Sequence, residues 1–197
     1  DLAVSAYALI SSTIGSYRIL LIGVAEGMQP LASKAYGASQ NGNATPAERI
    51  AAYDEIRHIR NKAIRTAIAA SVLLFLFTIA TASFYPALYG YQGDAAAAGY
   101  HAVMLTAAQL IFTGIVRVTN SFFYAVGKNR YSLFMIYFDP LCLTPAALAV
   151  LPHFFGTDGI WLTAVITQFL LNLVAAGMFV RHNAQMKREQ AALTKGV

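Results

Sequence analysis

Long apolar runs separated by short polar stretches make up most of this chain. Five of them approach or exceed the roughly 20 residues that an α-helix needs to cross a bilayer. They cover residues 2–35, 63–89, 98–126, 131–151 and 159–180. Their apolar positions cover every face of a helix, whereas a helix of a soluble protein has one apolar stripe. The pattern predicts an all-α, polytopic membrane helix bundle with about five transmembrane helices.

Other architectures fit the pattern less well. Strands of a membrane barrel alternate apolar and polar positions over about ten residues, and no such alternation persists here. The chain shows no internal repeat and no linker between domains. Residues 1–197 are therefore expected to form a single transmembrane region.

The connection at residues 37–61 is the only long one. It opens with turn-forming residues and continues with Thr45-Pro-Ala-Glu48, which resembles a capping box with proline at the first helical position. Apolar residues then follow at amphipathic spacing, namely Ile50, Tyr53, Ile56 and Ile59. We expect a cytoplasmic loop whose helical part lies along the inner membrane surface, with a regulatory or partner-binding role as the alternative.

Composition agrees with a membrane protein. The chain is 57% hydrophobic and 12% charged, against about 25% charged residues in soluble domains. Its net charge of +5 does not indicate nucleic-acid binding, because the basic residues lie between apolar runs and form no exposed stripe. The single cysteine, Cys142, and four scattered histidines predict no disulfide, metal site or cofactor.

The basic residues also predict an orientation, because Lys and Arg accumulate in cytoplasmic connections. Twelve of the fourteen lie on alternate connections or in the tail at 181–197. These are Lys34, Arg49, Arg57, Arg60, Lys62, Arg65, Lys128, Arg130, Arg181, Lys187, Arg188 and Lys195. The N-terminus is therefore expected outside and the C-terminus in the cytoplasm, in the cell (inner) membrane.

Four ionisable residues lie inside the predicted spans: Arg18, Glu26, Arg117 and Asp139. Such residues are costly in lipid and indicate function by default. At about 1.5 Å per residue, Arg117 and Asp139 lie roughly 16 Å and 13 Å from the inner ends of their spans. We expect these two to meet as an ion pair, which is either structural or part of a substrate pathway.

Glu26 has no basic residue three or four positions away on its own helix. It is a candidate for proton coupling if it is buried, or a water-exposed residue if it faces the cytoplasm. Gln29 and Pro30 follow at a position where proline frees a backbone carbonyl and favours a bend.

Further pathway candidates are uncharged. Gln109 and Asn120 are polar groups within a span, and Tyr124 is an aromatic residue at depth. Phe154, Phe155 and Trp161 are expected to anchor the fifth span at the interface.

Several short motifs carry a family resemblance. Gly27-Met-Gln-Pro-Leu-Ala-Ser33, followed by Tyr36-Gly-Ala38, resembles the end of the eighth helix of MATE (multidrug and toxic compound extrusion) antiporters. Phe122-Phe-Tyr-Ala-Val-Gly-Lys128 is similar to the end of their tenth helix, and Phe155-Gly-Thr-Asp-Gly-Ile-Trp161 to the start of their twelfth. The chain thus resembles helices eight to twelve, which form most of one lobe of a two-lobe transporter.

The resemblance implies secondary active efflux of organic, cationic compounds by proton- or sodium-coupled antiport, with alternating access between this lobe and an N-terminal lobe. The partners implied are the lipid bilayer, drug-like small molecules and that other lobe. Sodium-coupled members place an acid in the tenth helix where this chain has Gly114, so proton coupling is favoured. Related sequences often have Arg in the eleventh helix, where Asp139 and Pro140 stand here.

Three alternatives remain open at this point. A flippase for a lipid-linked or polyanionic substrate would need cationic residues in the cleft, and only Arg18 and Arg117 are available. A membrane-embedded enzyme would need catalytic groups that converge at one depth, which the sequence does not indicate. A non-transporting membrane scaffold is the third.

Overall fold

The structure is a computed structural model that describes residues 2–195, so the first residue and the last two residues of the predicted tail lie outside it. Across the described residues the chain consists of helices joined by short turns, without strands. The prediction of an all-α helix bundle is confirmed.

The first two helices are longer than the spans predicted from sequence. Helix α1 (Leu2–Ser39) continues through Pro30 without ending, and helix α2 covers Pro46–Thr81. The predicted capping box is present: the Thr45 side chain accepts a hydrogen bond from the Glu48 backbone N–H, and the Glu48 carboxylate accepts one from the Thr45 N–H.

The predicted surface segment within residues 37–61 is wrong in two respects. It is not separate from the second span, because no Gly or Pro occurs between residues 47 and 81 and a single helix runs through. Its apolar face also points into the protein, where Tyr53 and Ile56 are 3% and 1% exposed. Within residues 37–61, only residues 40–45 are non-helical.

The middle of the chain bends twice where continuous spans are predicted. The end of the predicted span 63–89 is a separate short helix, α3 (Phe84–Leu88). The predicted span 98–126 consists of α4 (Gly93–Ala107) and α5 (Gln109–Ala125), which meet at an angle of 45°.

The predicted span 131–151 is interrupted at its centre. Helix α6 (Asn129–Phe138) leads into a π-helical turn, η1 (Asp139–Leu143), and then into α7 (Thr144–Phe155). Helix α8 (Thr157–Lys195) extends well beyond the predicted span 159–180. Between α7 and α8 the chain reverses at Gly156, whose φ of +57° strains any other residue.

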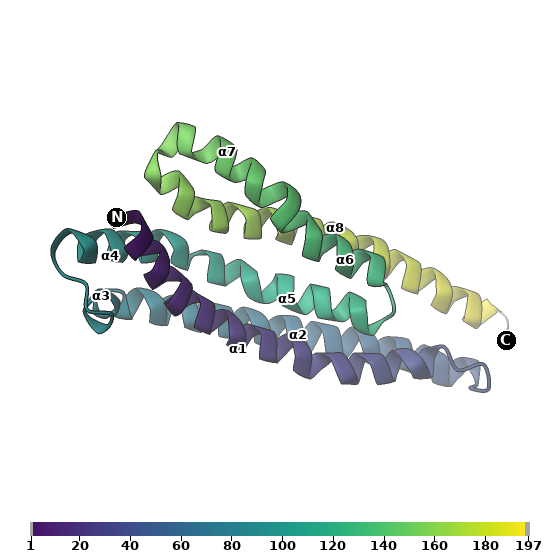
Figure 1. Ribbon diagram of the computed structural model, residues 1–197. Coiled ribbons are helices and arrows are strands. Elements are labelled where there is room, and N and C mark those ends of the chain that lie inside the picture. The colour runs from purple at the N-terminus through teal and green to yellow at the C-terminus, as the bar shows by residue number, and fades with distance from the viewer. Residues whose placement is uncertain (1, 196–197) are drawn as a thin grey trace.

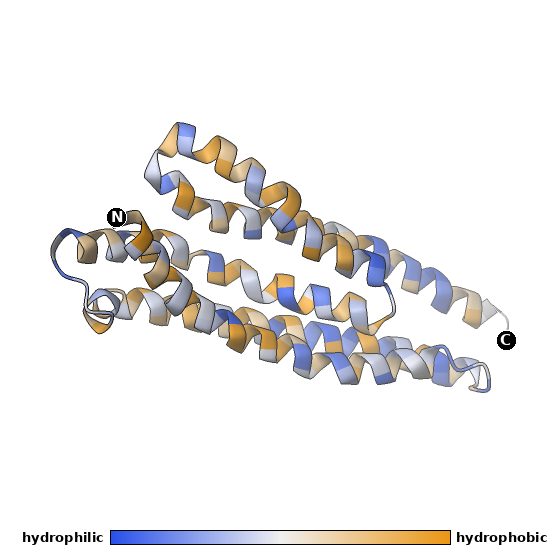
Figure 2. Cartoon of the chain, in the orientation of Figure 1, coloured by the Kyte–Doolittle hydropathy of each residue, from blue (hydrophilic) through white to orange (hydrophobic). Residues whose placement is uncertain are grey.

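The helices form a layered bundle. In Figure 1, α1 and α2 lie side by side on one face, α8 with α6 and α7 lies on the other, and α4 and α5 run between them. The N-terminus and the α7–α8 turn lie at one end. The loop at residues 40–45, the α5–α6 turn and the C-terminus lie at the other, which we call the basic end. Figure 2 shows hydrophilic residues of α2 and α8 gathered toward that end.

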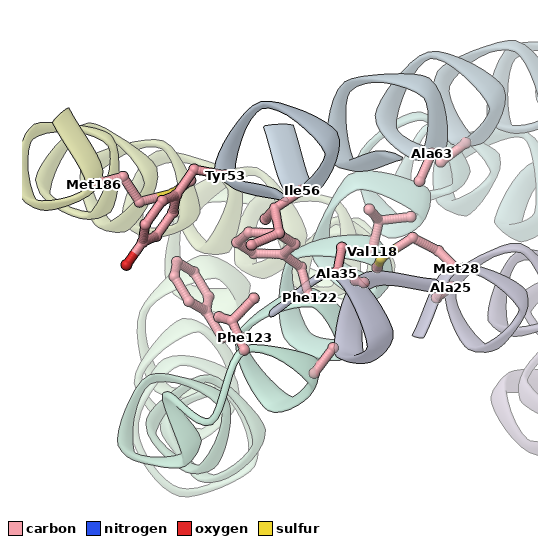
Figure 3. Packing of buried hydrophobic residues seen from close by; sticks show 14 residues of the cluster. Ala25, Met28, Ala35, Tyr53, Ile56, Ala63, Val118, Phe122, Phe123 and Met186 are labelled. Carbon is pink, nitrogen blue, oxygen red and sulfur yellow. The ribbon is translucent and has the colours of Figure 1, made fainter. Parts of the chain in front are cut away.

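Two large apolar clusters, and a smaller third one around Met135 and Leu171, hold the bundle together. One lies toward the basic end, where Phe122 and Phe123 of α5 are fully buried among residues of α1, α2 and α8, including Ile56 and Met186 (Figure 3). The other lies toward the opposite end and includes Leu9, Ile14 and Trp161. The motif residues Phe122 and Phe123 are therefore part of the core.

The outer surface of the bundle is apolar. On α2, for example, Leu73, Leu76 and Phe77 are exposed. Four helices are long and apolar enough to cross a membrane, or five if the bent pair α4–α5 counts as one span. The surface is the kind that lipid covers, since an exposed apolar band of this size is rare in soluble monomers.

Candidate functional site: a polar cavity between α1, α5 and α8

Two adjoining cavities open between α1, the α4–α5 bend, the π-helical turn and α8. The larger, of about 550 Å³, we call the Trp161 cavity; Ile14, Gln109, Leu148, Trp161 and Thr163 are among the residues that line it. The smaller, of about 270 Å³, we call the Arg117 cavity. Its lining includes Arg117, Asn120, Met135, Ile136 and Leu171. Arg18, Asp139 and Gln168 line both cavities and connect them.

Breaks in the helices put polar groups on the cavity walls. Gln109 is the first residue of α5 after the 45° bend, and it is buried beside the Trp161 cavity. On α8, Thr163, Thr167 and Gln168 are all buried. The Thr163 hydroxyl donates to the Gly159 carbonyl oxygen at 2.9 Å, within its own helix. The walls therefore offer neutral hydrogen-bonding groups inside an apolar bundle.

Asp139 is the acidic residue at the centre of the site. It begins the π-helical turn, a feature that often marks functional positions in helices. Its carboxylate accepts a hydrogen bond from the Thr144 hydroxyl at 3.0 Å and another from the Gln168 side-chain N–H at 3.1 Å. Both carboxylate oxygens are thus held by neutral donors on α7 and α8.

The expected ion pair between Arg117 and Asp139 is wrong, although both side chains line the Arg117 cavity. The only acid–base contacts within 4.0 Å among the described residues are Arg57–Asp54 and His101–Asp158. The sequence argument matched the two residues in depth but could not foresee that Thr144 and Gln168 would bind the carboxylate. Arg18, also a pathway candidate from the sequence, lines the same cavity from α1.

The other sequence-predicted site residues divide between this site and the outside of the bundle. Asn120 lines the Arg117 cavity and accepts a hydrogen bond from Ser132, which ties α5 to α6. Glu26, Pro30 and Tyr124 are exposed on the surface, and Gln29 is half-buried on α1 away from both cavities. The structure thus brings Arg18, Gln109, Arg117, Asn120 and Asp139 together, and leaves out the other four.

Sequence reasoning missed the contribution of α8. Trp161 was expected at the interface, but it is 8% exposed and forms part of the cavity wall. A signal was present in the spacing, because Thr163, Thr167 and Gln168 recur on one face of the apolar first half of this helix. Phe154 and Phe155 are exposed, as interfacial anchors are.

Gly114 faces away from the cavities. A Cβ at this position would collide with Ser71 Oγ and lie 3.0 Å from the Ala67 carbonyl oxygen, so α5 packs closely against α2 here. An acid at this position would have no room. Within residues 2–195, no three His, Cys, Asp or Glu side chains are grouped in a way that could hold a metal ion.

No protein-family model and no curated protein matches this sequence. Solved structures, in contrast, match the fold of this chain. One is described as the outward-facing conformation of a multidrug resistance MATE family transporter of the MOP superfamily, with a TM-score of 0.72 and 17% identity. Another is described as the inward-facing conformation of such a transporter, with a TM-score of 0.72 and 18% identity.

This chain has the fold of one half of a MATE transporter. The similarity covers 98% of this chain but only 39% and 43% of those two chains, so it spans less than half of their length. The resemblance to a MATE half, stated from the motifs, is thereby confirmed at the level of the fold. In this MATE-like half, the two cavities lie between α1, α5 and α8, the helices whose motifs resemble the eighth, tenth and twelfth of the family, and the π-helical turn η1.

Proposed function

We propose that the chain is most of one lobe of a MATE-like secondary transporter that moves organic compounds across the cell (inner) membrane by alternating access. The observation that carries this proposal is the equal similarity, with a TM-score of 0.72, to an outward-facing and an inward-facing transporter. A half that keeps one fold in both conformations can act as a rigid unit, as rocking of one lobe against another requires.

The exposed face of α1 supports a second lobe as partner. Between residues 11 and 27 it carries the small and polar Ser11, Ser16, Gly23, Glu26 and Gly27 together with two large apolar residues, Ile19 and Leu20. The exposed face of α2 in the apolar half of that helix instead carries residues such as Val72, Leu73 and Phe77. A face of small and polar side chains is suited to helix packing or water, while an apolar face is suited to lipid. We assign the α1 face to the cleft between the lobes.

Coupling to protons is favoured over coupling to sodium ions. Gly114 packs against α2 and leaves no room for a carboxylate. Glu26 remains the coupling candidate, now as a residue exposed on the α1 face, where water in the cleft can reach it.

The basic end is assigned to the cytoplasm, because the basic connections and the C-terminus all lie there. An enzymatic role has little support, since the cavity offers one carboxylate, Asp139, already bound by Thr144 and Gln168, and no nucleophile paired with a base. A scaffold role does not account for polar cavities of this size.

One observation favours a second candidate, a flippase for a lipid-linked or polyanionic substrate. Arg18 and Arg117 both line the Arg117 cavity. A cavity with two guanidinium groups attracts anions more than the organic cations that the sequence resemblance implies.

Transport assays on inside-out vesicles test the proposal. The protein is expressed from its complete gene, and the movement of a cationic dye such as ethidium and of an anionic dye such as carboxyfluorescein is followed while a proton gradient is imposed and then collapsed with a protonophore. We expect gradient-dependent dye movement that Glu26→Gln abolishes and Arg130→Gln, a change at the exposed basic end, preserves. Gradient-independent behaviour in the wild type would contradict secondary transport, and full proton dependence in Glu26→Gln would remove Glu26 from the mechanism.

A further inference from the structure

We infer that the Arg117 cavity binds the anionic group of an amphipathic organic anion, a carboxylate, sulfonate or phosphate, whose apolar body lies in the adjoining Trp161 cavity. This inference rests on the proposed function and names the substrate class of its site. It departs from the organic cations that the resemblance implies.

The first argument for an anionic ligand is the charge of the Arg117 cavity. Two guanidinium groups, of Arg18 and Arg117, line it together with one carboxylate, that of Asp139. Neither arginine has an acidic partner within 4.0 Å among the described residues. The Asp139 carboxylate is already bound by the Thr144 hydroxyl and the Gln168 amide. The cavity therefore has a surplus of positive charge.

The second argument is the depth of the arginines in the membrane. Arg117 precedes the basic turn at Lys128 by eleven positions, which corresponds to roughly 16 Å along a helix. A cation at such depth in a bilayer is costly unless an anion or water compensates it. Guanidinium groups bind carboxylate, sulfonate or phosphate oxygens in a planar, two-pronged geometry, so two of them from different helices are suited to one such group.

The third argument is the size and lining of the adjoining Trp161 cavity. The Trp161 cavity has about twice the volume of the Arg117 cavity, and its lining includes Ile14, Leu148 and Trp161 next to the neutral Gln109. An apolar or aromatic body fits these walls, with a few hydrogen bonds to orient it. Arg18 and Gln168 line both spaces, so a single ligand can extend from one to the other.

Binding of two probes that share a fluorophore but differ in charge tests this inference. Dansylglycine is an anion and dansylcadaverine a cation. Each is titrated against the purified chain in lipid nanodiscs while dansyl fluorescence is followed. We expect dansylglycine to bind more tightly, and Arg18→Gln and Arg117→Gln each to weaken its binding about tenfold, as for loss of a charged hydrogen bond. Dansylcadaverine should bind these variants at least as well as the wild type.

Matched variants separate the charge effect from misfolding. Arg130→Gln removes an exposed arginine at the basic end and should leave both affinities unchanged. Arg117→Lys keeps the charge and should recover part of the affinity that Arg117→Gln loses. Asp139→Asn removes the one negative charge and should tighten dansylglycine binding. Binding is compared only for variants whose size-exclusion profile in detergent matches that of the wild type.

Three outcomes would overturn the inference. They are tighter binding of dansylcadaverine by the wild type, no binding of dansylglycine, and equal dansylglycine binding by the wild type and both glutamine variants. Tighter binding of dansylcadaverine that Asp139→Asn abolishes would leave the transporter proposal standing with a cationic substrate. If dye movement in vesicles does not depend on the gradient but the chain binds dansylglycine, secondary transport is refuted and the anion-binding site stands.

Discussion

Arg60 shows how far a charged side chain can depart from what its neighbours in sequence indicate. It belongs to a run of basic residues that the sequence assigns to a cytoplasmic loop, yet it is only 6% exposed. Its guanidinium donates to the side-chain oxygens of Asn61 and Asn183 and lies over the rings of Phe122 and Phe179, at 5.7 and 5.3 Å from their centroids. It joins α2 to α8 at the basic end.

Replacing Arg60 with Gln should therefore destabilise the protein. The change removes a hydrogen-bonded, aromatic-stacked cation, and we expect a loss of about 1–3 kcal/mol in the free energy of unfolding. Thermal unfolding in detergent, followed by tryptophan fluorescence, measures it. Arg65→Gln on the same helix is the control, because Arg65 is exposed and its loss should cost less than about 0.5 kcal/mol. Equal effects of the two changes would show that burial of Arg60 contributes nothing.

At the residue scale, sequence reasoning identified the charged members of the cavity better than their partners. Arg18, Arg117 and Asp139 stood out because a charge in an apolar run is rare. Gln168 and Thr144 did not, because neutral polar residues inside spans are common and most bond to their own or a neighbouring helix. Which of them meets Asp139 depends on the rotation of α7 and α8, which periodicity alone does not set.

Helix packing decides the role of Gly114. On α5 it permits close approach to α2, where any Cβ would collide with Ser71 Oγ. Small residues allow such approach between helices in membranes.

The variant Gly114→Ala should accordingly lower the free energy of unfolding by about 1–3 kcal/mol, because an added methyl group overpacks the α2–α5 contact. The denaturation midpoint in a mixed detergent titration measures it. Gly177→Ala on α8 serves as control, because a Cβ there meets no atom within 4 Å. That change should be neutral or stabilise by about 0.5–1 kcal/mol through reduced backbone freedom. A Gly114→Ala protein as stable as Gly177→Ala would refute the close packing.

Apolar runs predicted the presence of most helices, but several of their ends and interruptions were not predictable. Continuity of α2 follows from the absence of Gly and Pro, and the sequence contained that information. The π-helical turn at Asp139 is different. Pro140 removes one backbone donor, but whether a helix kinks, ends or adopts a wider turn depends on what packs around it.

For the molecule as a whole, orientation is directly testable. In a Cys142→Ser background, single cysteines are introduced at Asn43, in the loop at residues 40–45, and at Gln92, directly before α4. Figure 1 shows these two connections at opposite ends of the bundle. If the basic end faces the cytoplasm, a membrane-impermeant maleimide added to intact cells should label Gln92→Cys and not Asn43→Cys. Inside-out vesicles should give the reverse. Labelling of Asn43→Cys in intact cells would invert the assigned orientation.

The isolated chain should not transport by itself. The described half has one lobe-like bundle and nothing to rock against, so these 197 residues alone should bind ligands without moving them. Reconstituted liposomes that contain only this chain, assayed for gradient-driven dye uptake, measure this. Transport above that of empty liposomes would contradict the lobe assignment, unless crosslinking shows that two copies assemble.

The sequence by itself determined the class of this protein. Its apolar runs, the alternation of basic and uncharged connections and a few motifs sufficed for a helical membrane bundle resembling a MATE half, because the requirements of the bilayer act on each segment independently. Only the tertiary structure decided which polar residues share a cavity. It showed that Arg117 and Asp139 do not form the expected ion pair, that Arg18 lines the cavity beside them, and that Glu26 is exposed on α1. These relations depend on how the helices rotate and pack.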